Sequence, residues 1–97
     1  MSVAPPNVSV LAQAAKIAIE QDRPIYFDYW ADSVAKRAVV GVNGANEKCL
    51  IKSDTEYTST ITQIFRVKDE PVFIVLTENS LYIVSSDIPV KKIVTSE

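Results

Sequence analysis

Aromatic and basic residues fall within one short stretch of the chain, among them Tyr26, Tyr29, Trp30, Lys36 and Arg37. Aromatic rings stack on unpaired bases and basic groups bind phosphates, so this combination is typical of surfaces that bind single-stranded nucleic acid. The full basic set of such a surface would be Lys36, Arg37, Lys52, Arg66 and Lys68. Nucleic-acid binding therefore requires these five side chains to gather on one face, beside Tyr26 or Trp30.

The same aromatic residues also suit a protein interface, where tryptophan and tyrosine are enriched. In that interpretation Tyr26 and Trp30 cover a sheet edge, while Tyr29 faces the core. The chain carries 10 basic and 12 acidic residues, a formal net charge of −2, so it has no overall attraction to nucleic acid. We therefore predict a protein interface and keep a nucleic-acid-binding accessory domain as the alternative.

Residues suited to catalysis are scarce. The chain has no histidine, one cysteine (Cys49) and two glycines, which rules out the common general base, a zinc site and a phosphate-binding glycine loop. Asp28 lies among aromatic residues, and we expect it to pair with Lys36 or Arg37. The sequence thus predicts a protein without enzymatic activity, cofactor or metal.

The compartment follows from the same composition. A lone Cys49 cannot form an intrachain disulfide, which fits a reducing, intracellular location. The longest apolar run, 72–76, is far shorter than the roughly 20 residues that span a bilayer. We expect neither a signal peptide nor membrane association.

An amphipathic helix is predicted from Asn7 or Ser9 to Gln21, ended by the following Arg23-Pro24. Its apolar residues form two stripes on nearly opposite sides. The first stripe contains Val8, Leu11, Ala12, Ala15 and Ile19, and the second contains Val10, Ala14 and Ile17. A helix on one small sheet needs only one apolar face. Either this small fold wraps its only helix deeply, or the second stripe contacts another subunit, and we favour the subunit contact.

The remainder of the chain reads as short strands separated by turns. They are expected at 25–30, 36–42 and 47–52, then three more within 58–85, and a short edge strand at 90–94. Asn43-Gly44 predicts the first hairpin, because both residues tolerate positive φ. A break in alternation at Gln63-Ile64 predicts a bulge.

The strand at 72–76 is apolar on both faces, with Val72, Ile74 and Leu76 on one side and Phe73 and Val75 on the other. Such a strand must be covered twice, by a closing barrel, a helix or a second subunit. We predict an α+β fold: a flexible arm (1–6), then one domain (7–97) with the helix on a curved antiparallel sheet or SH3/Sm-like half-barrel of five or six strands.

Partial resemblances accompany this prediction. Thr77-Glu78-Asn79-Ser80-Leu81-Tyr82 resembles the strand–turn–strand ending of small SH3-like β modules of viruses and bacteria. The stretch 15–42 is similar to the start of a WYL domain, an Sm-like barrel that binds nucleotide or nucleic-acid ligands, although the naming Trp-Tyr-Leu run and a proline after Arg37 are absent. As a whole, the chain resembles a small virion-packaged protein of marseillevirus-like giant DNA viruses, which implies a place in a viral particle.

Together these observations predict a non-enzymatic module that self-associates, most simply as a homodimer. Its interface is expected at Val10, Ala14, Ile17, Tyr26 and Trp30. A third interpretation, a small-ligand domain of WYL type, would require a pocket lined by aromatic residues.

Overall fold

The first element is the helix α1 (Val8–Gln21), and its ends follow local chemistry. The Asn7 side chain caps the first turn by accepting a hydrogen bond from the Val10 backbone amide at 3.1 Å. Asp22 closes the last turn in the left-handed conformation, with φ 55°. These contacts belong to a computed structural model that describes residues 6–53 and 55–92. The predicted helix and its two ends are confirmed.

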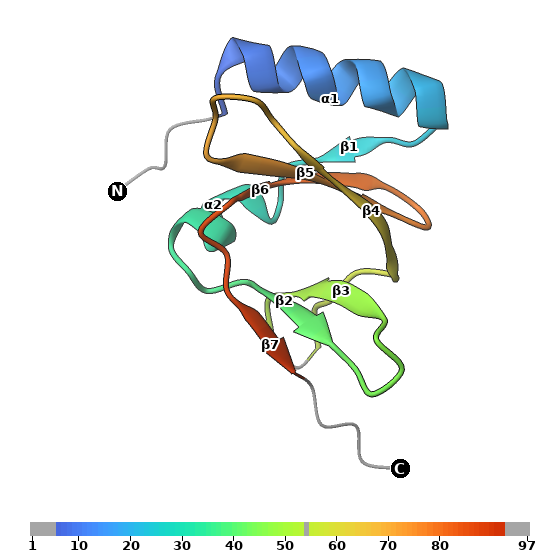
Figure 1. The fold of residues 1–97 in the computed structure, drawn as a ribbon, viewed down its shortest axis with the longest axis vertical. Helices are drawn as coiled ribbons and strands as arrows, with labels where there is room; N and C mark the ends of the chain where they lie inside the picture. Colours follow the sequence, from blue (N-terminus) through green and yellow to red (C-terminus); the bar gives the residue numbers. More distant parts are fainter. Residues whose placement is uncertain (1–5, 54, 93–97) are drawn as a thin grey trace.

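A four-stranded sheet lies under α1 (Figure 1). Its strands, in spatial order, are β1 (Ile25–Tyr26), β6 (Leu81–Ser85), β5 (Val72–Thr77) and β4 (Ile61–Arg66). The β4–β5 and β5–β6 pairs are antiparallel, whereas β1 runs parallel to β6. Strand β4 is therefore one outer edge of this sheet.

A second sheet of three strands stacks on the opposite face of the first (Figure 1). Its spatial order is β3 (Lys48–Ile51), β2 (Val39–Val42) and β7 (Val90–Lys92). The β2–β3 pair is an antiparallel hairpin, and β7 joins β2 in parallel. The protein is thus α+β with a helix, a sheet and a second sheet in three layers.

Strand β5 stands between two hydrophobic cores. Ile74 and its same-side neighbours Val72 and Leu76 belong to the core beneath α1. Val75, with Phe73 packed nearby, belongs to the core between the two sheets. The prediction that this strand is covered on both faces is confirmed, with α1 on one side and the second sheet on the other.

The prediction of one continuous sheet or half-barrel is wrong. The strands form two separate sheets, each containing one parallel pair, and they do not close into a barrel. Consecutive segments change sheet at three places, between β1 and β2, between β3 and β4, and between β6 and β7. Each crossing interrupts the run of neighbouring antiparallel strands on which a half-barrel depends.

The predicted strand at 25–30 is also shorter than expected. It ends at Tyr26, and a short helix, α2 (Trp30–Val34), follows. The buried Ser33 hydroxyl donates to the Trp30 carbonyl at 2.7 Å and accepts from the Ser85 backbone amide at 2.8 Å. This serine attaches α2 to β6 and turns the chain toward the second sheet.

The first hairpin is present, but its turn differs from the predicted one. Positive φ occurs at Asn46 (64°) and not at Gly44. The Asn43 side-chain carbonyl instead accepts hydrogen bonds from the amides of Ala45 and Glu47 at 2.8 and 3.0 Å. The side chain of Asn43 therefore organises a longer loop than a two-residue reversal.

Two further predictions concern β4 and the chain ends. The irregularity in β4 lies between Ile61 and Gln63, close to the predicted bulge. Of the predicted arm, residues 1–5 lie outside the described residues, and Pro6 is buried. The predicted tail strand is seen as β7 over Val90–Lys92, and its remaining residues, 93–94, lie outside the described part. Within the described ranges, no helix is both long and apolar enough to cross a bilayer.

Candidate functional site

The two stripes of α1 have the opposite roles to those predicted. Val10 and Ala14 are 0% exposed in the core beneath the helix, and Ile17 packs against the same core. Val8 and Ile19, from the other stripe, are 80% and 82% exposed. Val10 and Ala14 therefore cannot lie in an intermolecular contact, because the chain's own sheet already covers them.

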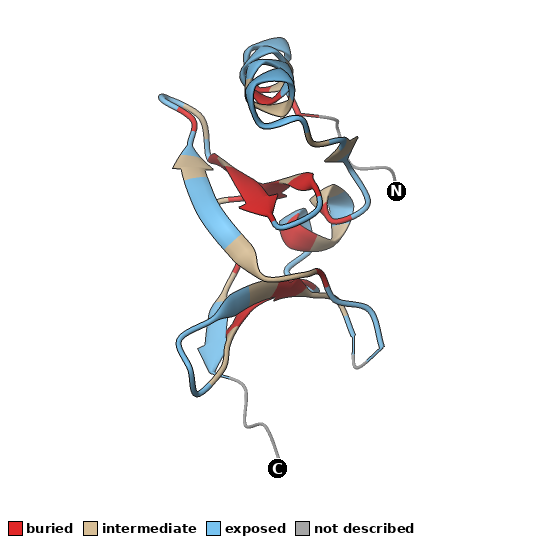
Figure 2. Ribbon diagram, turned by 90° about the vertical axis from the view of Figure 1, so that its right-hand side faces the viewer, coloured by how far each residue is buried: buried red, intermediate tan, exposed pale blue. Residues whose placement is uncertain are grey.

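The outward face of α1 nevertheless carries an apolar stripe, beside the exposed polar residues Ser9, Gln13, Lys16 and Glu20. Between Val8 and Ile19, the exposed positions on the same side are Ala12 and Ala15. Leu11, at the border of this face, is half-buried against the core. Figure 2 shows the outside of the helix largely in the exposed colour. We call Val8, Ala12, Ala15 and Ile19 the outer stripe of α1.

Three tyrosines, Tyr26, Tyr29 and Tyr82, form a cluster on the side of the first sheet that faces the second. The rings of Tyr26 and Tyr82 lie 5.8 Å apart, and those of Tyr29 and Tyr82 meet edge to face at 5.3 Å. Tyr29 is buried, as expected, whereas Tyr26 is 47% exposed. Trp30 is half-buried and packs against the core beneath α1, so Tyr26 and Trp30 do not share a surface.

An ion-pair network borders this cluster and uses the charges predicted for nucleic acid. The Lys52 ammonium lies 3.7 Å from a carboxylate oxygen of both Asp28 and Asp32, and 4.6 Å from the centre of the Tyr29 ring. The Arg37 Nε donates to Asp32 at 3.1 Å. The expected partner of Asp28 was Lys36 or Arg37, and this was wrong. Lys52, the residue that follows β3, takes that place because the fold brings the end of β3 close to Asp28 and Asp32.

Burial changes the acidity of the groups in this cluster. It raises the pKa of the Tyr29 hydroxyl, and the negative charge of Asp28 adds to the effect. The pKa of Tyr82 is raised by the same two causes, burial first. Burial also raises the pKa of the Cys49 thiol, which keeps it protonated and unreactive near neutral pH.

The raised pKa of Tyr29 predicts a loss of stability in alkali. An unfolded tyrosine loses its proton near pH 10, while the folded Tyr29 keeps it. Above pH 10 the unfolded state therefore binds fewer protons, and the free energy of unfolding should fall by up to about 1.4 kcal/mol per pH unit. This contribution is complete below pH 10 and is lost as the pH rises through the folded pKa. Urea denaturation at a series of pH values from 9 to 12 measures the slope.

Tyr29→Phe supplies the comparison, because it removes the titrating hydroxyl and keeps the ring. Above pH 10, the free energy of unfolding of Tyr29→Phe should fall less steeply with pH than that of the wild-type protein. Equal slopes for the wild type and Tyr29→Phe would contradict the prediction.

The five basic residues proposed for nucleic acid do not meet on one face. Arg37 and Lys52 lie beside Asp32, and Lys36 follows α2. Arg66 and Lys68 lie at the β4 edge, on the far side of the four-stranded sheet from β1. Two of the five are neutralised by carboxylates and two lie at a separate edge, so the expected basic face is not formed.

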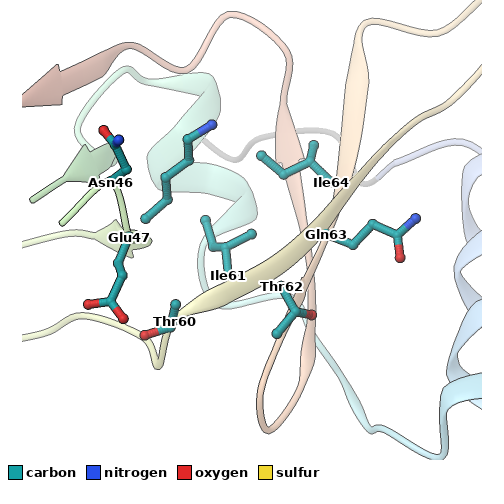
Figure 3. Close-up of a pocket in the computed structure, with 8 residues that line it drawn as sticks. Asn46, Glu47, Thr60, Ile61, Thr62, Gln63 and Ile64 are labelled. Carbon is teal, nitrogen blue, oxygen red and sulfur yellow. The ribbon is translucent and has the colours of Figure 1, made fainter.

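Two hollows flank the β4 edge. The larger, about 410 Å³, lies between the β2–β3 loop and residues 60–64, and Figure 3 shows Asn46 and Glu47 across from Thr60. The smaller, about 220 Å³, opens between α1 and the end of β4 and is lined by Gln13, Ile17, Phe65, Arg66, Val67, Lys68 and Ile74. Neither hollow includes Tyr26, Tyr29 or Trp30, so the aromatic pocket required for a small-ligand domain is not at these places. In the sequence, the only local signal for the β4 edge is the break in alternation at Gln63-Ile64.

Comparison with known proteins identified no relative of this chain. No family model, no curated protein and no solved structure matches the chain.

Proposed function

We propose that this protein is a non-enzymatic interaction module that self-associates as a homodimer through the outer stripe of α1. The observation that carries the proposal is the exposure of Val8 and Ile19, at 80% and 82%, on a helix whose opposite face is already buried. Large apolar side chains left in water on one helix face are stabilised when a second apolar surface covers them. The predicted homodimer is retained, but its contact moves to the opposite face of the helix.

A second copy fits this stripe because the stripe is self-complementary. Two antiparallel helices related by a two-fold axis midway between Ala12 and Ala15 would place Val8 opposite Ile19 of the second copy. The same axis places Ala12 opposite Ala15, and these small side chains allow the helices to approach closely. Large residues at both ends and small residues in the middle therefore match the reversed pattern of the other helix.

Tyr26 does not add to this contact. Its ring stacks with Tyr82 on the face of the sheet that points away from α1. The contact then consists of one helix pair, which is small for a protein interface. We expect a dissociation constant on the order of 10–100 µM.

Sedimentation velocity over a concentration series tests the proposal. The wild-type protein should move from monomer to dimer with rising concentration, and Ile19→Glu should remain monomeric because it would bury a charge in the contact. The matched control is Val90→Glu, which places the same charge on another exposed apolar residue and should leave the dimer intact. A wild type that stays monomeric at several hundred micromolar would refute the proposal, as would an Ile19→Glu protein that dimerises normally.

The biological setting is proposed on resemblance alone. Similarity to a virion-packaged protein would place this module in a viral particle. Quantitative mass spectrometry of purified particles from the natural source would detect it there, and its absence from particles would remove this part of the proposal.

A further inference from the structure

Among the described residues, no strand pairs with the outer side of β4, at the edge of the four-stranded sheet. Its inner side pairs with β5, and the pairing continues past the strand to a hydrogen bond from the Val67 amide to the Val72 carbonyl. Hydrogen-bonded pairs alternate along antiparallel strands, so Phe65 also turns its amide and carbonyl toward β5. The backbone groups of Ile64 and Arg66 then point outward, where a further strand could pair with them.

Little in this strand blocks such pairing. Residues 60–64 contain no charge and no proline, and Ile64 is 38% exposed. The irregularity between Ile61 and Gln63 disturbs the first part of the strand. The regular part of the edge is therefore Gln63 to Arg66, in which Arg66 is the only charged residue.

The smaller hollow gives this edge a chemical preference. Its floor is apolar, from Ile17, Phe65, Val67 and Ile74, and its charged lining residues are Arg66 and Lys68. No acidic residue lines it. Within the described residues, neither basic side chain forms an ion pair with a carboxylate. An apolar side chain followed by a carboxylate matches this surface.

We infer that the β4 edge binds an extended peptide of another protein by strand addition, and that this peptide alternates apolar with acidic residues. Its backbone would pair with Ile64 and Arg66, and its apolar side chains would enter the hollow between α1 and β4. Its carboxylates would meet Arg66 and Lys68. This surface is separate from the outer stripe of α1, so it does not depend on the proposed homodimer.

A fluorescein-labelled peptide of alternating valine and glutamate residues is the direct probe, with alternating valine and lysine as its counterpart. Fluorescence anisotropy with the full chain should give a dissociation constant on the order of 100 µM for the acidic peptide and at least tenfold weaker binding for the basic one. Arg66→Glu should weaken binding of the acidic peptide about tenfold. Lys91→Glu, an exposed charge reversal on β7, should not.

Amide hydrogen exchange locates the contact without changing the protein. Saturating acidic peptide should slow exchange at Ile64 and Arg66 specifically. No acidic-peptide binding at millimolar concentration would overturn the inference, as would equal affinity for the two peptides. Protection of these amides that appears with protein concentration alone would also overturn it, because a second copy would then occupy the edge. That result differs from failure of the α1 homodimer, which the Ile19→Glu protein reports.

Discussion

Val10→Asp is expected to abolish stable folding of this protein. Val10 is 0% exposed and packs in the core between α1 and the sheet, where a carboxylate would have neither water nor a positive partner. An unpaired buried charge costs several kcal/mol, against a total stability of about 5–15 kcal/mol for a typical domain. Far-ultraviolet circular dichroism and urea denaturation should show loss of the helix signal and of the cooperative transition.

Val8→Asp is the matched control, two residues away on the outer stripe. Val8 is 80% exposed, and a carboxylate in the first turn interacts favourably with the helix dipole. The free energy of unfolding should therefore change by less than about 1 kcal/mol, measured at a concentration where the protein is monomeric. If Val8→Asp unfolded the protein and Val10→Asp did not, the helix would be turned the other way, as the sequence had suggested.

The sequence could identify α1 but not the face that it buries. Helical spacing and the Asn7 cap are local properties, and both were read correctly. The two apolar stripes are similar in strength: Val8 and Ile19 lie outside, while Val10 and Ile17 lie against the core. Tertiary packing decides between them, since the small Ala14 sits at the buried face and lets the helix approach the sheet.

The strands show the same division between local and distant information. The apolar residues on both faces of the strand around Ile74 predicted that both faces are buried, and the structure buries one under α1 and the other under the second sheet. The parallel pairs β1–β6 and β2–β7 join segments far apart in the chain. The alternation of apolar and polar residues in these strands does not indicate which distant strand each one pairs with, so the split into two sheets could not be predicted.

Charge pairing was the least predictable part of the candidate site. Neighbouring positions suggested Asp28 with Lys36 or Arg37, whereas the structure brings Lys52 to Asp28 from the end of β3. This contact depends on how the second sheet stacks beneath α2. The open β4 edge is also a consequence of sheet order, which the pattern of Ile64 and its neighbours does not encode.

Leu50→Ala is expected to lower the free energy of unfolding by about 2–5 kcal/mol. Leu50 lies on β3, is 0% exposed, and fills the core between the two sheets together with Val75 and Val84. Truncation removes apolar contacts and leaves a cavity that two stacked sheets cannot readily close. Val90→Ala is the control in the same sheet, where 65% exposure limits the expected loss to about 0.5 kcal/mol.

Trp30 fluorescence makes this substitution a test of the three-layer fold. Trp30 packs against the core beneath α1, on the other side of β5 from Leu50. Because β5 contributes side chains to both cores, a small domain of this kind should unfold as one cooperative unit. The urea midpoint reported by Trp30 should therefore fall by the same amount as the midpoint reported by circular dichroism. A Trp30 transition that Leu50→Ala leaves unmoved would mean that the two cores unfold separately, and the stabilising role given to β5 as their shared strand would then be wrong.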